Sequence, residues 1–367
     1  MREQQRPKRE PRSSLATFRR GLWVPRLFLP YWLRELLLGR SFQRKMGYRM
    51  DFGDPRTFNE EIQWCKLYYH HPDAVRIADK VAFKAYVAER LGKGHTAQLY
   101  GAWDDVNAID FAGMPIPYVL KSNCCAYGDC VLFVFDHAQL DPARLRRELK
   151  PWLDPMNTII PQSARGYFHI EKPLVMAEAY VGSEQTPPVD YKFFCFGGVP
   201  RYVYSASEHF QDGKAITSAI SFYDMDWQPL DVRYGDSRRC DLPKPTHFDE
   251  MRQAAELLSQ GFPFMRVDFY DCEDRWLVGE MTFSSGAGFK KFDPESFDRD
   301  LGDLFELPPK NTDREPFRGD LLVAYLRHVA GAFRNLIRGE EGAAHDHDAR
   351  APWQRDLRAV GGRGPRV

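Results

Sequence analysis

Two observations predict an α+β fold. Helical patterns dominate the chain before about Tyr118, and short strand patterns bounded by turn residues dominate the stretch that follows. Helices followed by strands, and then by a mixed region, indicate an α+β enzyme rather than a helical bundle or a β-sandwich. The 367 residues, 43% of them hydrophobic, supply enough apolar material for two domains or one large multi-lobed domain.

Helices are predicted where apolar residues recur at helical spacing. Beyond the N-terminal region they cover residues 57–67, 73–91, 248–260 and 319–337. The second of these begins after Pro72 and ends at Gly92, with Ile77, Val81 and Ala85 on one face. Residues 15–46 mix Leu, Phe and Trp with arginines and are expected to form one or two short helices.

Strands are predicted from short runs of β-branched and aromatic residues. They cover residues 118–121, 174–181, 190–196, 201–207, 264–270 and 276–283. The sequence Gly-Gly-Val-Pro at 197–200 predicts a tight turn, so the third and fourth strands are expected to form a hairpin. The last two strands flank the polar loop 271–275.

The charge is balanced overall but not along the chain. The 51 basic residues cancel the 51 acidic ones, which argues against a dedicated nucleic-acid binder. Residues 1–50 nevertheless hold 13 Lys and Arg against 3 Asp and Glu. We expect a basic, partly disordered N-terminal arm over 1–50, and a disordered tail over 339–367, where no core-forming pattern occurs.

The arm has the composition of an interfacial helix. Between residues 15 and 50, Leu, Phe and Trp alternate with arginines, a pattern that favours binding to an anionic membrane surface. The alternative is that the same apolar residues dock on the rest of the protein, which is acidic, with 38 Lys and Arg against 48 Asp and Glu. Pro25 and Pro30 interrupt any single long helix, and no run approaches the roughly 20 apolar residues of a membrane span.

Cysteine usage and missing motifs narrow the function. The seven cysteines are scattered, with no CxxC pair, so a reducing cytoplasm is the expected location, at the inner face of the plasma membrane if the arm binds lipid. The sequence lacks the P-loop, GxGxxG, HExxH and GxSxG motifs. These absences exclude the commonest nucleotide-binding, zinc-protease and serine-hydrolase types.

The last two strands group four polar side chains. Alternate residues of a strand share a face, so Arg266 and Asp268 point away from the apolar residues Met265, Val267 and Phe269. In the next strand Glu280 and Thr282 share a face. If Tyr270 pairs with Trp276, Arg266 lies opposite Glu280, with Asp268 diagonal to it. A hard cation between the carboxylates and a solvated Arg–Glu pair account equally well for this pattern.

Two further positions carry charge at strand ends. Lys121 ends a strand just before a loop of small residues, where it could bind phosphate or simply be solvated. Asp190 and Lys192 share one strand face and could form an ordinary ion pair.

In this order and spacing, the segments resemble the ATP-grasp superfamily. The RVDF strand and the Glu-containing strand after it are similar to the C-terminal lobe of D-alanine–D-alanine ligases. The fuller resemblance is to the TupA-like branch, named for teichuronopeptide synthesis and associated with cell-surface polysaccharides. The similar segments are TFNEEIQW (57–64), ADKVAFKAYV (78–87), YVLKSN (118–123), VDYKFFCFGG (189–198), PFMRVDFY (263–270) and VGEMTFSSGAG (278–288).

The resemblance implies an ATP-grasp fold, in which two α+β lobes clasp ATP, here with an N-terminal helical extension. A helical region would cover 51–117, the lid lobe 118–182, the catalytic lobe 183–310 and a C-terminal helix 311–338. Lys121 and Lys192 would hold the phosphates of ATP. Glu178 would read adenine and ribose together with the backbone of Ala179, Tyr180 and Val181, and Asp190 would complete the ATP-binding set.

The resemblance also implies a magnesium site and a reaction. Asp268, Glu280 and Thr282 would bind Mg²⁺, and Arg266 would face the reacting acyl-phosphate oxygens. Thr282 stands where the family usually has Asn, and the lid sequence Asn-Cys-Cys-Ala-Tyr-Gly at 123–128 keeps only one glycine.

The implied function is an ATP-dependent carboxylate–amine ligase in cell-surface polysaccharide or glycopeptide biosynthesis. Its acceptor would be a carboxylate-bearing glycan or amino acid. The alternatives are an ATP-using or glycosyltransferase-like transferase on the same glycans, and a degenerate nucleotide-binding module.

Overall fold

The structure is a computed structural model, which describes residues 29–125, 130–159, 165–182, 187–211, 214–313 and 318–338. The chain divides into two compact units, Leu29–Pro316 and the combination of Met1–Phe28 with Phe317–Val367. In the second unit the described element is α11 (Gly319–Arg338), close to the predicted helix 319–337. The predicted tail 339–367 lies outside the described residues.

One sheet of the larger unit has four antiparallel strands. These are β1 (Leu99–Trp103), β2 (Tyr118–Ser122), β3 (Val131–Val134) and β4 (Val175–Ala179), in the order β1-β4-β2-β3. Leu120 and Ala177 point to one face, where they pack with Leu145 and Leu149 of α6 (Pro142–Leu149). Lys121 lies on the other face of β2, because side chains alternate along a strand.

A second sheet has six antiparallel strands in the order β11-β10-β5-β6-β7-β8. Their bounds are β5 (Asp190–Phe196), β6 (Val199–Gln211), β7 (Lys214–Tyr223), β8 (Pro229–Leu230), β10 (Phe264–Asp271) and β11 (Trp276–Thr282). A short pair, β9 (Arg233–Tyr234) with β12 (Phe292–Asp293), forms a separate two-stranded sheet. The predicted hairpin at 190–207 is confirmed as β5 and β6.

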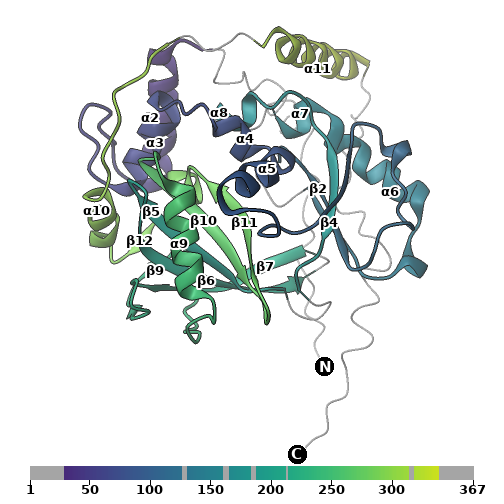
Figure 1. Cartoon of the computed structure of the whole chain (residues 1–367). Coiled ribbons are helices and arrows are strands. Elements are labelled where there is room, and N and C mark those ends of the chain that lie inside the picture. The colour runs from purple at the N-terminus through teal and green to yellow at the C-terminus, as the bar shows by residue number, and fades with distance from the viewer. Residues whose placement is uncertain are drawn as a thin grey trace, which may run out of the picture. The chain divides into compact units, whose positions relative to one another are not determined.

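Apolar residues on both faces of the six-stranded sheet pack against helices. Figure 1 shows the strands of this sheet, with α9 crossing in front of them. On one face, α5 (Lys80–Leu91) and α9 (Phe248–Ser259) pack on the alternate residues Phe193, Val267 and Phe269. On the other face, α3 (Phe58–Tyr68) and α10 (Ser296–Gly302) pack on an aromatic cluster of β5, β6, β7 and β10. That cluster contains Phe194, Phe196, Tyr204, Phe222 and Phe264.

The predicted helix 73–91 is two helices, α4 (Ala74–Ala78) and α5. Asp79 separates them because its backbone is extended and its side chain accepts hydrogen bonds from the amides of Val81 and Ala82. An aspartate in this position caps the following helix and ends the preceding one. The remaining short helices are α7 (Pro155–Thr158), α8 (Arg165–Phe168) and the 3₁₀ turns Val106–Ala108, His137–Gln139, Lys150–Leu153 and Ser285–Gly288.

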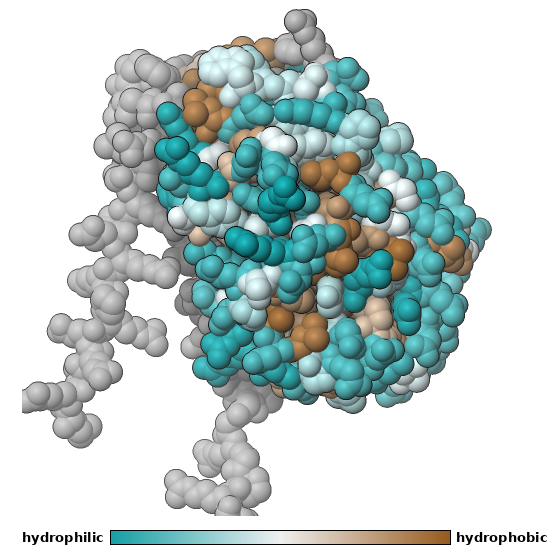
Figure 2. All heavy atoms as spheres, turned by 90° about the vertical axis from the view of Figure 1, so that its left-hand side faces the viewer, coloured by the Kyte–Doolittle hydropathy of each residue, from teal (hydrophilic) through white to brown (hydrophobic). Residues whose placement is uncertain are grey.

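Part of the basic arm is a packed helix, α2 (Tyr31–Met46). Leu38 packs with residues of α3, and Phe42 is fully buried, so the inner face docks on the body. The outer face exposes Trp32 and Leu36, at 65% and 42% of their maximal areas. Figure 2 views the side that carries α2 and α10, where apolar side chains form separate small patches on a mostly hydrophilic surface. Residues 15–28 of the arm lie outside the described part.

No helix within the described residues combines the length and the apolar composition needed to cross a membrane.

Candidate active site

The β10–β11 hairpin has a different register from the predicted one. Asp268 lies opposite Glu280 and Arg266 opposite Thr282, whereas the sequence placed Arg266 opposite Glu280. The prediction was wrong because β10 extends to Asp271 and the register shifts by one residue at Gly279. This β-bulge has no room for a side chain, since a Cβ on Gly279 would lie 2.8 Å from the Tyr270 ring.

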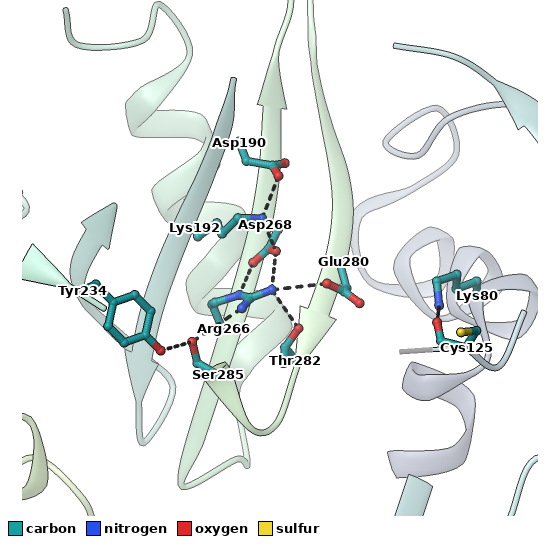
Figure 3. A network of polar contacts seen from close by, with 10 residues as sticks. All are labelled: Lys80, Cys125, Asp190, Lys192, Tyr234, Arg266, Asp268, Glu280, Thr282 and Ser285. Carbon is teal, nitrogen blue, oxygen red and sulfur yellow. Dashed lines mark hydrogen bonds and ion pairs between the residues drawn. The ribbon is translucent and has the colours of Figure 1, made fainter. Parts of the chain in front are cut away.

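The prediction that the four polar side chains of this hairpin share one face is confirmed: Asp268, Glu280 and Thr282 surround Arg266 (Figure 3). Its Nε donates to Asp268 Oδ1 at 2.7 Å and its Nη2 to Asp268 Oδ2 at 2.6 Å. The same Nη2 lies 3.2 Å from Glu280 Oε2 and 3.1 Å from Thr282 Oγ1. One nitrogen therefore touches an oxygen of each of the three predicted metal ligands.

Lys192 links Asp268 to Asp190 on the neighbouring strand β5. Its Nζ lies 2.7 Å from Asp268 Oδ2 and 2.7 Å from Asp190 Oδ2. Burial alone would raise the pKa of Asp268, but Arg266 and Lys192 lower it below its ordinary value. Burial raises the pKa of Asp190, against the opposing effect of Lys192. Asp268 is thus ionised at neutral pH, as a metal ligand must be.

On the four-stranded sheet, Glu178 pairs with two lysines. Its Oε1 accepts from Lys121 Nζ at 2.6 Å, and its Oε2 lies 2.6 Å from Lys84 Nζ of α5. Burial alone would raise the pKa of Glu178, but Lys121 and Lys84 lower it to about 2. The carboxylate is therefore a fixed negative charge that orients both ammonium groups.

Lys84 was missed by the sequence analysis, although it lies within the ADKVAFKAYV segment (78–87). Its place in an amphipathic helix resembles that of any solvated lysine. Its spacing from Asp79 could have identified it, because Asp79 caps the start of α5 and thereby determines which face of the helix carries Lys84.

The charged residues around Glu178 on the four-stranded sheet and those around Arg266 on the six-stranded sheet are close enough to interact electrostatically. The pKa of Lys121 is raised: burial would lower it, and Glu178 raises it, with smaller contributions from Glu280 and Asp190 of the six-stranded sheet. The combined site holds four cations and four carboxylates. The cations are Lys84, Lys121, Lys192 and Arg266, and the carboxylates are Glu178, Asp190, Asp268 and Glu280.

The predicted adenine-reading backbone lies at the end of β4. The amide of Ala179 donates to Gln98 O at 2.9 Å, and the amide of Tyr180 donates to Pro117 O at 3.1 Å. Both donors are therefore used within the protein, and recognition of adenine here would depend on carbonyl groups and on Val181.

The three predicted metal ligands fit a magnesium ion by donor type and by convergence. Two carboxylates and a hydroxyl are the hard oxygen donors that Mg²⁺ prefers, and all three contact one nitrogen of Arg266. Asp268 is buried, at 2% exposed, whereas the Glu280 side chain is 39% exposed and accessible to an incoming ion. Across the described residues, no group of three or more His, Cys, Asp or Glu could hold a metal.

The cysteine-bearing lid segment is described only at its start. Cys124 and Cys125 are buried, and burial raises the pKa of the Cys124 thiol. Lys80 Nζ donates to the carbonyl oxygen of Cys125 at 2.7 Å (Figure 3). Residues 126–129 lie outside the described part of the chain.

The loop after β11 is held by α3, a role the sequence analysis did not assign. Asn59 Nδ2 donates to Lys290 O at 3.1 Å, Gln63 Nε2 to Ala287 O at 2.9 Å, and Lys66 also donates to Ala287 O. Gly288 permits this close approach, since a Cβ there would lie 2.4 Å from Gln63 Nε2. The polar residues of the segment 57–64 thus fix the loop beside the metal ligands.

The two antiparallel sheets, each of which contributes charged residues to the site, belong to an ATP-grasp fold. The model of the family described as TupA-like ATPgrasp matches residues 60–306, more than half of the chain, so the chain belongs to this family. The sequence resemblance is thereby confirmed for the ATP-grasp superfamily. No curated protein matches the chain.

Several solved structures are similar to the chain at low identity. A structure of the ATP-grasp ligase PsnB complexed with a minimal precursor is 13% identical, with a TM-score of 0.34, over 81% of this chain and 72% of that one. D-alanine–D-alanine ligase from Bacillus anthracis complexed with ATP is 14% identical, with a TM-score of 0.37, over 72% and 68%. An ADP complex of PurK, N5-carboxyaminoimidazole ribonucleotide synthetase, is 12% identical, with a TM-score of 0.34, over 65% and 54%.

Proposed function

We propose that this protein is an ATP-dependent carboxylate–amine ligase. The observation that carries the proposal is the contact of Arg266 Nη2 with Asp268, Glu280 and Thr282, beside the ammonium group of Lys192. This set has the donors needed to hold a metal-bound triphosphate and a guanidinium that can face the transferring phosphoryl group. The lobes 118–182 and 183–310 would clasp ATP between them.

The proposed reaction has two balanced steps. A carboxylate oxygen of the acceptor attacks the γ-phosphorus of ATP, the bond to the β–γ bridging oxygen breaks, and ADP leaves. An amine then attacks the acyl carbon, phosphate leaves, and the nitrogen loses a proton as the amide forms. No side-chain nucleophile is needed.

Each charged residue has a role in this scheme. Lys84, Lys121 and Lys192 would bind the phosphates, and their carboxylate partners hold them in position before ATP arrives. Asp268, Glu280 and Thr282 would hold Mg²⁺, which when bound neutralises phosphate charge. Arg266 would stabilise the negative charge that develops on the oxygens between acceptor and γ-phosphate.

We propose a cell-surface polysaccharide or glycopeptide precursor as the acceptor, on the basis of the family alone. The test is a mass-spectrometric product scan with Mg–ATP, candidate uronic acids or amino-acid-bearing glycans, and candidate amines. ADP, phosphate and a new amide support the ligase. ADP with a phosphorylated sugar would indicate a transferase instead, and no product with any pair would favour the degenerate module.

We also propose that the N-terminal arm meets an anionic membrane. The proposal is supported by an exposed stripe along α2, at Trp32, Leu36, Arg40 and Arg44, which joins apolar and basic side chains. Because the inner face of α2 is packed, truncation would damage the fold, and surface variants are the cleaner test. Trp32→Ser with Leu36→Ser should reduce sedimentation with phosphatidylglycerol vesicles at low salt, and an unchanged pelleted fraction would contradict the proposal.

A further inference from the structure

The polar network continues beyond Arg266 to two hydroxyl groups that the phosphate and metal roles do not use. Arg266 Nη1 donates to Ser285 Oγ at 3.5 Å, and Ser285 Oγ lies 3.2 Å from the hydroxyl of Tyr234 (Figure 3). Ser285 and Tyr234 are both buried. On this side, Arg266 is therefore bordered by hydroxyl groups instead of carboxylates.

Lys290 adds a second cation beside these hydroxyls. Its Nζ lies 4.2 Å from the centre of the Tyr234 ring. Within the described residues, no carboxylate lies at ion-pair distance from Lys290 Nζ, whereas Lys84 and Lys121 are each paired with one carboxylate and Lys192 with two. Lys290 thus differs from the other lysines of the site.

The charge of Lys290 is poorly compensated. Burial, together with repulsion from Arg266 and Lys192, lowers the pKa of Lys290 to about 8, against the opposing effect of Asp236. An anion placed between the ammonium group and Arg266 would remove this mutual repulsion. A half-buried cation with no counter-ion is a favourable place for an anionic group to bind.

The position of Lys290 is fixed by its neighbours. Asn59 holds its carbonyl oxygen, and two glycines leave room for its side chain. A Cβ on Gly235 would lie 2.7 Å from Lys290 Cε, and a Cβ on Gly286 would lie 2.8 Å from Lys290 Cβ. Both glycines have positive φ, so other residues would be strained there even without the clash.

We propose that Lys290, together with Arg266, Ser285 and Tyr234, binds the carboxylate of the acceptor. The inference rests on the proposed ligase function and identifies the part of the site that selects an anionic acceptor. Arg266 contacts both the metal-ligand set and Ser285, so a carboxylate held on the Ser285 side would lie next to the phosphoryl group that it attacks. Lys84, Lys121 and Lys192 are assigned to the phosphates of ATP, so Lys290 is available to bind the second substrate.

The first experiment uses the wild-type protein and measures acetylation of individual lysines by peptide mass spectrometry. The probes are Mg–AMPPNP alone and Mg–AMPPNP with millimolar D-glucuronate or L-glutamate. We expect a carboxylate probe to reduce acetylation of Lys290 by about threefold or more, and that of its exposed neighbour Lys291 not at all. Equal protection by the nucleotide alone, or no protection by either carboxylate, would overturn the proposal.

The second experiment compares Lys290→Ala, Lys290→Arg and the control Lys291→Ala in carboxylate-dependent ADP formation. Lys290→Ala should raise the KM for the carboxylate by about tenfold or more, Lys290→Arg should restore most of the loss, and Lys291→Ala should match the wild type. The KM for ATP should not change, and a rise confined to ATP would overturn the proposal.

Calorimetry with Mg–ATP separates this inference from the function on which it rests. If the wild-type protein does not bind Mg–ATP, the ligase function itself fails. If Mg–ATP binds and Lys290 shows no response to carboxylates, only the assignment of Lys290 fails.

Discussion

Arg266 and Asp268, two residues apart on β10, form a two-point ion pair, with Nε on Oδ1 at 2.7 Å and Nη2 on Oδ2 at 2.6 Å. A metal ion that uses Asp268 must therefore share or displace this guanidinium. The competition gives the site a preference for binding metal together with nucleotide, because the added phosphates give Arg266 a new anionic partner.

Removing Arg266 should change metal binding and turnover in opposite directions. Without nucleotide, Arg266→Ala should bind Mn²⁺ more tightly than the wild type, since Asp268, Glu280 and Thr282 lose a competing cation. ADP formation should nevertheless fall sharply. Electron paramagnetic resonance of free Mn²⁺ measures the binding, with Arg275→Ala, an exposed position in the adjoining loop, as control. Weaker Mn²⁺ binding by Arg266→Ala would argue against competition.

The two carboxylate ligands should differ in their effect on stability. Glu280→Gln and Asp268→Asn should each abolish magnesium-dependent ATP binding. Asp268→Asn should also lower the free energy of unfolding by about 3 kcal/mol or more, because Arg266 and Lys192 would lose a buried partner. Glu280 is partly exposed, so its variant should stay within about 1 kcal/mol of the wild type. Urea unfolding and ATP titration test both expectations, and wild-type ATP binding in either variant would remove that residue from the metal site.

Phosphate binding should depend on the lysines that Glu178 orients. Lys84→Ala and Lys121→Ala should each weaken ATP binding by roughly tenfold or more, since a charge-assisted hydrogen bond contributes about 1.5–3 kcal/mol. AMP affinity should change little. Lys172→Ala is the matched control, because that exposed lysine also pairs with a carboxylate, Asp104. Equal losses for AMP and ATP would indicate a structural role.

Glu61 should make stability depend on pH. Burial raises the pKa of Glu61 from its ordinary 4.5 to about 9, and nearby Glu60 acts in the same direction. The folded state thus keeps a proton that the unfolded state loses above pH 4.5, so wild-type stability falls as the pH rises from 4.5 to 9. Glu61→Gln should not show this loss, which in the wild type amounts to up to about 1.4 kcal/mol of unfolding free energy per pH unit.

Thermal unfolding of Glu61→Gln at several pH values measures this effect. The advantage of the variant over the wild type should be absent near pH 4.5 and should grow toward pH 9. Glu273→Gln, at an exposed position, should track the wild type at every pH. A pH-independent difference for Glu61→Gln would show that Glu61 ionises normally.

Much of the candidate site could be predicted because alternation along a strand is a local property. The spacing of Arg266 and Asp268, and of Glu280 and Thr282, places each pair on one face without any knowledge of the partner strand. The register could not be predicted, because it depends on the β-bulge at Gly279. A glycine within a strand can be either paired or part of a bulge, and the sequence does not distinguish the two.

Residues that act across long sequence separations were also missed. Lys84 forms an ion pair with Glu178 from a helix. Asn59 and Gln63 donate hydrogen bonds to a loop more than two hundred residues away in the sequence. In the sequence these residues resemble the solvated face of a helix. The neighbouring sequence gives no sign that the carbonyl groups of residues 287–290 will accept hydrogen bonds from them. Strands β1 and β3 were missed as well, because their runs are only five and four residues long. Strand β7 was also missed, although its ten residues form a continuous run rich in β-branched and aromatic residues.

The bulge at Gly279 has a further consequence for how this strand tolerates change. Met281 beyond the bulge, and Val278 and Trp276 before it, all join the same apolar core although strict alternation would separate them. The two halves of β11 are thus out of phase by one residue, and Gly279 absorbs the difference. Deleting Gly279 would remove the extra residue and leave a strand of regular alternation, in which Asp268 still lies opposite Glu280 and Val267 opposite Met281. Substituting Gly279 with a larger residue, whose Cβ would meet the Tyr270 ring, should therefore be more damaging than deleting it.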